Sequence, residues 1–360
     1  DFAAGKSLTI GDAATEALTV VGATANFNGT VDSGATFANN LTVNATNALF
    51  GDQVGNKAFG ALGTLWTDAA GTTTLSTDVV TGDTLNFDDD VVTTVASTLT
   101  GTTLVDFAAG KSLTIGDAAA EALTVVGATA DFNGTVDSGA TFANNLTVNA
   151  PTTMFHAVVG GVSPLGVLAT DAAGTTTIDT TAVTGAVLDF NDKLVLDQTT
   201  TLTGTTSVDF AQTVDSAASE QNSLTVNSPQ TTFNGNVGTA ANGALGSLTT
   251  DAAGTTTLNA TQFTTAGNTM TFNDAVVLTQ DVTLTDTGTT GITFNSTVDS
   301  DATARDLTLN AGAGDVTFNG VVGAASALDE LTVNSAHDVT VNATVTVAGV
   351  TQATGTGTTT

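Results

Sequence analysis

Short runs in which apolar and polar residues alternate recur along the whole chain. Leu41-Thr42-Val43-Asn44 and Leu331-Thr332-Val333-Asn334 are two of them. A period of two places successive side chains on opposite faces of a β-strand, so Leu and Val are expected to point inward and Thr outward. Thr and Val favour strands, whereas the abundant Gly, Asn and Asp favour turns. The pattern predicts an all-β fold made of many short strands joined by tight turns.

The tripeptide Phe-Asn-Gly recurs at the ends of these runs, beginning at Phe27, Phe132, Phe233 and Phe318. Asn-Gly accepts a positive φ at low cost, so it is expected to bend the chain sharply. The same dipeptide is also a strong signal for a β-hairpin. Tandem antiparallel β-sandwich domains of about 100 residues are therefore the alternative fold.

Long internal repeats favour a stack of equivalent layers instead. Residues 1–45 recur at 106–150 with two changes, and the block 68–74 recurs at 171–177 and 251–257. These repeats divide the chain into super-repeats of approximately 1–105, 106–208 and 209–360. The third copy lacks the equivalent of 107–131, which is about one coil. A stack can lose one layer and continue, because each layer contacts only its neighbours.

The spacing therefore predicts one continuous repeat array over residues 1–360. We expect a single parallel β-solenoid, a right-handed β-helix, with coils of about 20–25 residues. Some sixteen such coils at about 4.8 Å each predict a rod on the order of 75 Å long.

Equivalent positions of successive coils are expected to lie directly above one another and to form ladders. Stacked rings and leucines would fill the core, and stacked asparagine amides would bond along a corner. The predicted ring positions are Phe27, Phe132, Phe155, Phe233, Phe294 and Phe318. The predicted leucine positions are Leu41, Leu146, Leu224 and Leu331, and the predicted amide positions are Asn28, Asn133, Asn234 and Asn319.

The composition excludes several classes of protein and partner. The chain has 35 Asp and Glu against 5 Lys and Arg, a formal net charge of −30, which argues against binding to nucleic acids or to anionic lipid. The 41% of apolar residues can fill a core, which argues against disorder. Cysteine is absent, so disulfides and thiolate metal sites are excluded. No apolar run approaches the ~18 residues of a membrane span, so we expect no membrane insertion by this segment.

Few residues can carry chemistry. His156 and His337 have no helpers at a known motif spacing and are expected at exposed turns. Aspartates cluster at Asp88, Asp89 and Asp90, and at Asp299 and Asp301 beside Arg305. They are weak candidates for Ca²⁺, which prefers six to eight oxygen ligands. The same clusters allow an alternative function, a carbohydrate-active β-helix enzyme (a polysaccharide lyase or hydrolase), although the scattered cations fit acidic sugars poorly. We otherwise expect no enzyme and no cofactor.

The recurring pattern Leu-Thr-Val-Asn … Phe-Asn-Gly-x-Val resembles the repeat regions of large bacterial surface proteins. Those proteins are the filamentous-haemagglutinin-like and autotransporter adhesins, whose passengers are right-handed parallel β-helices. The resemblance implies a non-catalytic structural or adhesive rod at the bacterial cell surface. Such a rod would be part of a long secreted fibre that acts in adhesion, in biofilms or in sheath and filament formation. The expected partners are other copies of the chain, neighbouring fibres and surface polysaccharide.

Overall fold

The computed structural model describes residues 1–34, 37–56, 60–353 and 357–360. Every helix or strand in this part of the chain is a β-strand, and the pairings are parallel. The chain forms two compact units, residues 1–179 with 183–186, and residues 180–182 with 187–360. The predicted parallel β-solenoid is confirmed, and the antiparallel sandwich alternative is wrong. Continuity of one array through both units stays a prediction.

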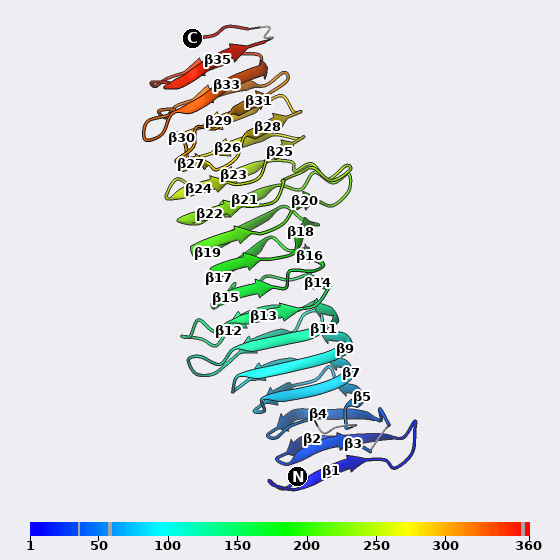
Figure 1. Cartoon of the computed structure of the whole chain (residues 1–360). Coiled ribbons are helices and arrows are strands. Elements are labelled where there is room, and N and C mark those ends of the chain that lie inside the picture. Colours follow the sequence, from blue (N-terminus) through cyan, green and yellow to red (C-terminus); the bar gives the residue numbers. More distant parts are fainter. Residues whose placement is uncertain (35–36, 57–59, 354–356) are drawn as a thin grey trace. The chain divides into compact units, whose positions relative to one another are not determined.

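The strands are short and follow one another closely in both units (Figure 1). The first unit contains β1 (Ser7–Ile10), β2 (Ala17–Phe27), β3 (Thr30–Ser33), β4 (Asn40–Phe50), β5 (Leu62–Thr67), β6 (Thr72–Leu75), β7 (Val79–Phe87), β8 (Asp90–Thr93), β9 (Ser97–Phe107), β10 (Ser112–Ile115), β11 (Leu123–Phe132), β12 (Thr135–Ser138), β13 (Leu146–Asn149), β14 (Thr152–Phe155), β15 (Leu165–Thr170) and β16 (Thr175–Ile178). Strand β17 (Ala182–Phe190) holds residues of both units.

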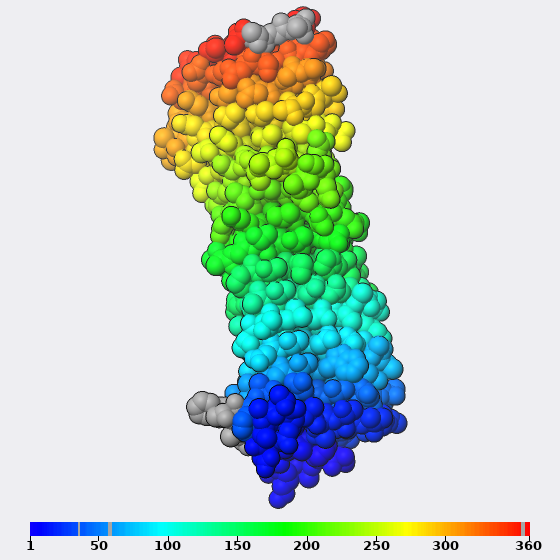
Figure 2. Space-filling view, turned by 90° about the vertical axis from the view of Figure 1, so that its right-hand side faces the viewer, coloured from blue at the N-terminus to red at the C-terminus, as the bar shows by residue number. Residues whose placement is uncertain are grey.

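The second unit continues in the same style. It contains β18 (Lys193–Leu196), β19 (Thr200–Phe210), β20 (Val214–Ser216), β21 (Leu224–Asn227), β22 (Gln230–Phe233), β23 (Leu248–Thr250), β24 (Thr255–Leu258), β25 (Gln262–Thr265), β26 (Thr269–Phe272), β27 (Ala275–Leu278), β28 (Val282–Asp286), β29 (Gly291–Phe294), β30 (Val298–Ser300), β31 (Leu307–Asn310), β32 (Asp315–Phe318), β33 (Leu328–Ser335), β34 (Val339–Val341) and β35 (Val347–Gln352). Each coil adds a thin layer to its unit, so residue colours lie in bands in Figure 2.

Some strands are longer than the short strands that the alternating pattern predicted. Strand β11 has 10 residues because it continues around a corner, where its register against β9 shifts between Gly127 and Thr129. In the next coil two short strands take its place, since Leu123 pairs with Leu146 of β13 and Phe132 with Phe155 of β14. One long strand thus forms two sides of a coil.

The inward positions form the core of each unit. The six predicted phenylalanines are at most 1% exposed, and the four predicted leucines at most 4%. Leucine pairs with leucine in register in the neighbouring coil, as in Leu41↔Leu65, Leu146↔Leu168, Leu224↔Leu248 and Leu307↔Leu331. We call such a set of in-register residues on one side a column. Because the side chains of a column touch through successive layers, burial rather than local propensity stabilises the strands.

Phenylalanine rings do not form one ladder. They form separate stacks, two in each unit, with neighbouring ring centroids 4.7–5.8 Å apart. The stacks of the first unit are Phe2–Phe27–Phe50 and Phe87–Phe107–Phe132–Phe155, and those of the second are Phe190–Phe210–Phe233 and Phe272–Phe294–Phe318. Above Phe50 the same column continues with Leu75 and Thr93, while the next stack stands on another side.

Unequal coil lengths explain this change of side. Phe27 pairs with Phe50, 23 residues later, whereas Leu75 pairs with Thr93, 18 residues later. A super-repeat is therefore not a whole number of coils. Neighbouring coils within a stack do place equivalent positions above one another, as expected. Equivalent positions of successive super-repeats, such as Phe27 and Phe132, lie in different stacks.

The expected role of glycine in Phe-Asn-Gly is also wrong. None of Gly29, Gly134, Gly235 and Gly320 has a positive φ. Instead, a Cβ added to Gly134 would lie 2.3 Å from the Lys111 carbonyl oxygen in the preceding coil. Glycine is required there because the backbones of two coils approach each other closely.

Candidate interaction site: anchored loop pairs

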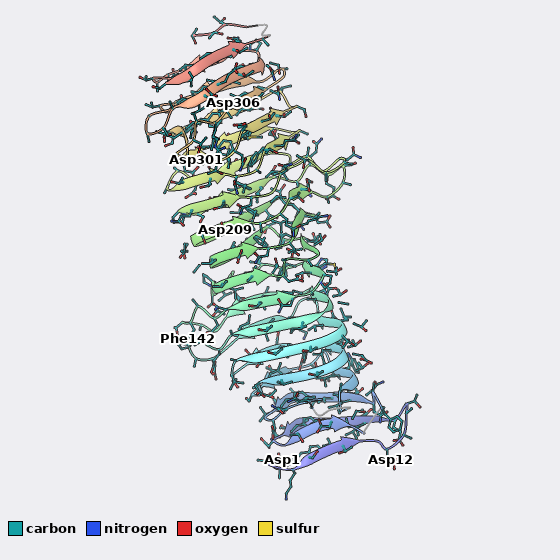
Figure 3. The ribbon with its side chains drawn as sticks, viewed as in Figure 1. Asp1, Asp12, Phe142, Asp209, Asp301 and Asp306 are labelled. Carbon is teal, nitrogen blue, oxygen red and sulfur yellow. The ribbon has the colours of Figure 1, made fainter. Side chains whose placement is uncertain are left out.

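Each copy of the sequence Thr-Val-Asp-Ser introduces a loop, and a second loop lies one coil later. The first loops are 34–39, 139–144, 217–222 and 301–305. The second loops are 55–61, 160–164, 238–244 and 323–327, and residues 35–36 and 57–59 of these ranges lie outside the described part. We call each such combination a loop pair. Phe142 marks the first loop of one pair, which extends away from the strands (Figure 3).

The serine of Thr-Val-Asp-Ser closes the first loop in the same way in all four copies. Its Oγ accepts a hydrogen bond from a backbone N–H at the far end of the loop. The bonds are Asn39 N to Ser33 at 2.9 Å, Asn144 N to Ser138 at 2.8 Å, Asn222 N to Ser216 at 2.8 Å and Arg305 N to Ser300 at 3.0 Å. The loop base is therefore set by one side chain that is the same in every copy.

The aspartate of the same motif holds the second loop. Asp137 Oδ1 accepts hydrogen bonds from Val162 N at 2.8 Å and Ser163 N at 3.1 Å. Asp299 Oδ1 binds two backbone N–H groups of its second loop at 2.7 and 3.2 Å, and Asp215 Oδ1 binds Ala240 N at 2.9 Å. These aspartates point outward from the strand, yet Asp215 is only 7% exposed because the loop covers it. Charge-assisted bonds of this kind are among the stronger hydrogen bonds in proteins.

A glycine begins each second loop and fixes its direction. Gly55, Gly160 and Gly238 have φ of +67°, and Gly323 has +69°. A Cβ on Gly160 would also lie 2.1 Å from the Thr184 carbonyl oxygen. Only glycine combines this left-handed backbone with so close a contact.

The loop tips differ although the anchors are the same. Val162 at one tip is 88% exposed, whereas the corresponding tip in the second unit carries Ala240 and Ala241. Constant anchors with differing tips are typical of loops that bind a partner from a rigid scaffold. The anchors could not be predicted directly from the sequence, because the bonded residues lie up to 27 positions apart. The recurrence of Thr-Val-Asp-Ser and of Val-Gly was the available signal.

Within each unit, the two loop pairs project from different sides. In the first unit Val31 belongs to the column of Val54 and Val80, whereas Val136 belongs to the column of Leu113 and Val91. In the second unit the columns of Val214 and Val298 differ in the same way, as Val237↔Phe263 and Val276↔Val298 show. The unequal coil lengths that move the phenylalanine stacks therefore also move the loops.

One loop pair of the second unit encloses a groove. A cavity of about 440 Å³ lies against its two loops and is lined by Lys193, Thr213, Asp215, Ala217, Thr239 and Ala240, among others. In the same loops Ser219, Gln221 and Asn242 have φ of 57–71°, a left-handed backbone that costs non-glycine residues about 1–2 kcal/mol each. A hydrogen bond of 2.8 Å from Ser219 N to the Asn242 carbonyl oxygen helps to hold this shape.

The three consecutive aspartates predicted as weak calcium ligands point to different partners. Asp88 Oδ2 accepts a hydrogen bond from Trp66 Nε1 at 2.7 Å, and Asp90 Oδ1 accepts two from Ser112. Asp89 is only 2% exposed, and its two oxygens accept bonds from the hydroxyls of Thr67 and Thr73, each at 2.7 Å. Burial raises the pKa of Asp89 against these two bonds. The three carboxylates do not converge on a common point.

The cluster of Asp89 recurs in the second unit. Asp274 is 1% exposed and accepts hydrogen bonds from Thr250 at 2.6 Å and Thr256 at 2.8 Å. Its pKa is raised by burial, and the two threonine bonds oppose that shift. We call these groups the aspartate–threonine clusters. These clusters could not be predicted from the sequence, because their threonines lie 16–24 residues from the carboxylate.

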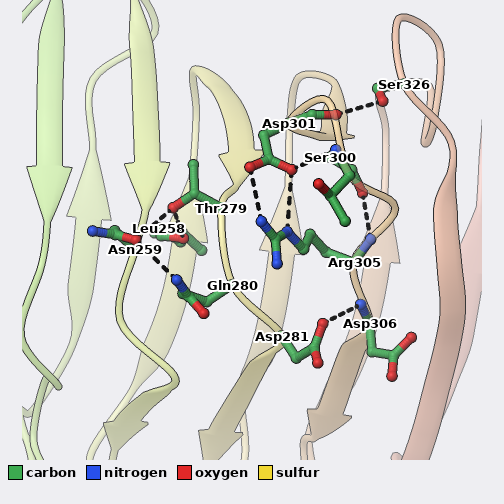
Figure 4. A network of polar contacts seen from close by, with 11 residues as sticks. Leu258, Asn259, Thr279, Gln280, Asp281, Ser300, Asp301, Arg305, Asp306 and Ser326 are labelled. Atoms are coloured by element: carbon green, nitrogen blue, oxygen red, sulfur yellow. Dashed lines mark hydrogen bonds and ion pairs between the residues drawn. The ribbon is translucent and has the colours of Figure 1, made fainter.

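The second predicted aspartate group is part of a polar network (Figure 4). Asp301 receives two bonds from Arg305, Nε at 3.1 Å and Nη2 at 2.9 Å, which hold the pKa of Asp301 below its ordinary value. Asp299 instead anchors its loop pair, as described above. These two predicted calcium ligands thus have different partners in the chain, and calcium binding there stays a prediction.

The predicted asparagine positions have two kinds of partner. Asn319 lies in a row of four amides joined by three bonds of 2.6–2.7 Å, in which Asn342, Asn319 and Asn295 each donate from Nδ2 to the Oδ1 of the next amide, ending at Asn273. Asn234 accepts from Asn259 in the same manner at 2.9 Å. Asn28 and Asn133 donate to the carboxylates of Asp1 and Asp106 instead.

Each histidine contacts two carboxylates. These contacts were not predicted from the positions of the histidines in turns. His156 Nε2 lies 3.3 Å from Asp131, and its Nδ1 lies 2.9 Å from Asp179. His337 Nδ1 lies 3.0 Å from Asp315 and 3.4 Å from Asp338. The hydrogen bond with Asp315 raises the pKa of His337 and lowers that of Asp315. In both cases a partner lies one coil away, 22 or 23 residues along the chain.

Comparison with models of protein families, with curated proteins and with solved structures finds no match to this chain. Within the described residues, no helix is long and apolar enough to cross a membrane.

Proposed function

We propose that this chain is a non-catalytic repeat segment of an extracellular structural or adhesive protein. In this proposal the segment belongs to a long secreted protein of a bacterial cell surface or matrix, of the filamentous-haemagglutinin-like or autotransporter adhesin type. The observation that supports it best is the loop pair. The serine and glycine anchors are the same in four copies and the aspartate anchor is present in three, yet the loop tips differ in sequence. Each unit presents its two pairs on different sides.

The proposed mechanism is multivalent contact from a stiff support. Parallel main-chain ladders within each unit hold the loop bases in place, and several weak contacts made together gain avidity. The proposed partners are other copies of the chain, neighbouring fibres and surface polysaccharide. A net charge of −30 makes like segments repel at low salt, so their association is expected to need screening or divalent cations.

Light scattering of the intact chain at low salt, at high salt and with added Ca²⁺ tests this proposal. We expect association to increase with screening. The double variant Val162→Asp with Ala241→Asp places charges on two loop tips and should weaken association at high salt. The double variant Val21→Asp with Thr103→Asp adds the same two charges at exposed strand positions outside the loops and is the matched control. Equal association of all three proteins at every salt concentration would contradict the loops as the interaction site.

The alternative function, cleavage of polysaccharides, can be tested with the same protein samples. It assigns catalysis to the two predicted aspartate groups, whose oxygens face hydrogen-bond donors of the chain. New reducing or unsaturated ends after incubation with acidic or neutral polysaccharides would support an enzyme in place of a scaffold.

A further inference from the structure

A cluster near the end of the second unit has the composition of a metal site. Asp315 is the first residue of β32, and His337 and Asp338 lie one coil later in the turn before β34. One ligand atom from each lies within 4.8 Å of the other two, and this is the one such group of at least three residues among those described. All three side chains are 39–54% exposed, so an ion can reach them from solvent.

Two of the three spacings in this cluster are close to those around a small tetrahedral ion. His337 Nδ1 lies 3.0 Å from Asp315 Oδ1 and 3.4 Å from Asp338 Oδ2. Ligands about 2.0–2.2 Å from Zn²⁺ in a tetrahedron lie roughly 3.3–3.5 Å from each other. Replacement of the imidazole proton by Zn²⁺ therefore requires only small movements of these side chains.

Other contacts hold both carboxylates in place. Asp338 Oδ1 accepts a hydrogen bond from Thr358 N at 2.6 Å, which leaves Oδ2 directed at the imidazole. Asp315 Oδ1 accepts a bond from Asp338 N at 3.0 Å. Hydrogen bonds of this kind orient the ligands of metal sites and restrict their motion.

We propose that Asp315, His337 and Asp338 bind a divalent transition-metal ion of the Zn²⁺ type. Water completes the coordination, because the chain supplies three ligands at an open surface. One imidazole and two carboxylates favour Zn²⁺ over Ca²⁺, which requires six to eight oxygens. The ion would join two successive coils, and Asp338 would link it to the last described residues through Thr358. This inference is independent of the proposed adhesive function.

The other histidine provides a control within the same chain. His156 also contacts two carboxylates, but Asp131 meets Nε2 and Asp179 meets Nδ1. The two nitrogens lie on different edges of the ring, so one ion cannot bind a nitrogen of His156 and both carboxylates. We therefore expect zinc to distinguish two histidines with similar charged surroundings.

Nuclear magnetic resonance of the imidazole groups tests the proposal directly, since the chain contains two histidines. The intact chain is titrated with Zn²⁺ at about pH 8, where most imidazoles are neutral. We expect the His337 signals to shift with saturation at micromolar zinc, while the His156 signals stay in place. In the aspartate variants the His156 signals also report that the fold is intact.

Variants assign the ligands. Asp338→Asn and Asp315→Asn should each weaken zinc binding at least about tenfold, in line with the loss of one of three ligands. His156→Ala should leave the affinity unchanged. The proposal is overturned if neither histidine responds up to millimolar zinc, if both shift in parallel, or if the aspartate variants bind zinc as tightly as the natural chain.

Discussion

The phenylalanine stacks and the aspartate–threonine clusters fill the interior in two different ways. A stack such as Phe107–Phe132–Phe155 buries rings against rings with centroids 5.3 and 4.8 Å apart. A cluster such as Asp274 with Thr250 and Thr256 buries a carboxylate that has two hydroxyl donors. Both lie in the same parallel framework, so the strand ladders accept either kind of filling. The stack depends on buried area and shape, and the cluster depends on complete hydrogen bonding.

The two fillings meet where a stack begins. Thr67, a donor in the first cluster, pairs in register with Phe87, the first ring of the long stack in the first unit. The cluster thus fills the core on a side of the coil where the phenylalanine stack has not begun. Because the coil next to this cluster is short, the following phenylalanines lie on the side of the cluster. The stack therefore changes side between Phe50 and Phe87, where successive coils differ in length.

The largest effect is expected for removal of a ring. Phe132→Ala deletes a fully buried side chain between two stacked neighbours and should lower the free energy of unfolding by about 3–5 kcal/mol. Denaturant unfolding followed by circular dichroism measures the loss. Phe142→Ala, in a loop away from the strands, is the control and should change stability little. A loss below about 1 kcal/mol at Phe132 would show that stacking is not a main source of stability.

A smaller loss is expected when a cluster loses one donor. Thr256→Val keeps the shape of the side chain but removes one of the two hydroxyl bonds to the buried Asp274 carboxylate, which should cost about 1–3 kcal/mol at neutral pH. Thr257→Val at the adjacent, outward position is the control, and a change within about 0.5 kcal/mol is expected there. Equal effects at both positions would mean that the cluster contributes no more than an ordinary surface threonine.

The smallest effect, and one that depends on pH, is expected for Asp274→Asn. Burial raises the pKa of Asp274 in the folded chain. The stability from this group is therefore fully present below its unfolded pKa, and it decreases as the pH rises through the folded value. The stability of the variant relative to the natural chain should accordingly increase from about pH 4 to pH 7.

Urea unfolding at several pH values measures this change. Asp301→Asn is a control of opposite sign, because Arg305 lowers the pKa of Asp301. That carboxylate contributes stability above its unfolded pKa and loses it as the pH falls, so the penalty of the Asp301 variant should fade in acid. A flat difference across the pH range for Asp274→Asn would show that its carboxylate is not destabilised by burial.

Local features of the sequence were enough to predict the strands and the solenoid. The alternation Leu-Thr-Val-Asn requires one inward and one outward face, and repeats about 23 residues long place like residues in adjacent layers. Pairs such as Phe132 with Phe155 follow from these two rules. The glycine of Phe-Asn-Gly was predicted for its backbone freedom, but it is required because of a close contact. The Lys111 carbonyl group that approaches Gly134 belongs to another coil, so this contact could not be predicted locally.

Strand alternation and repeat spacing are local properties, so the residue order alone specifies the type of layer and the contact of each layer with the next. The side on which each phenylalanine stack and each loop pair stands depends on the folded coils, since small differences in coil length accumulate along a unit. The same packing gives Asp137, Asp274 and His337 their partners Val162, Thr250 and Asp315. These three partners lie 22 to 25 residues away, and the packing of one coil on another brings them together.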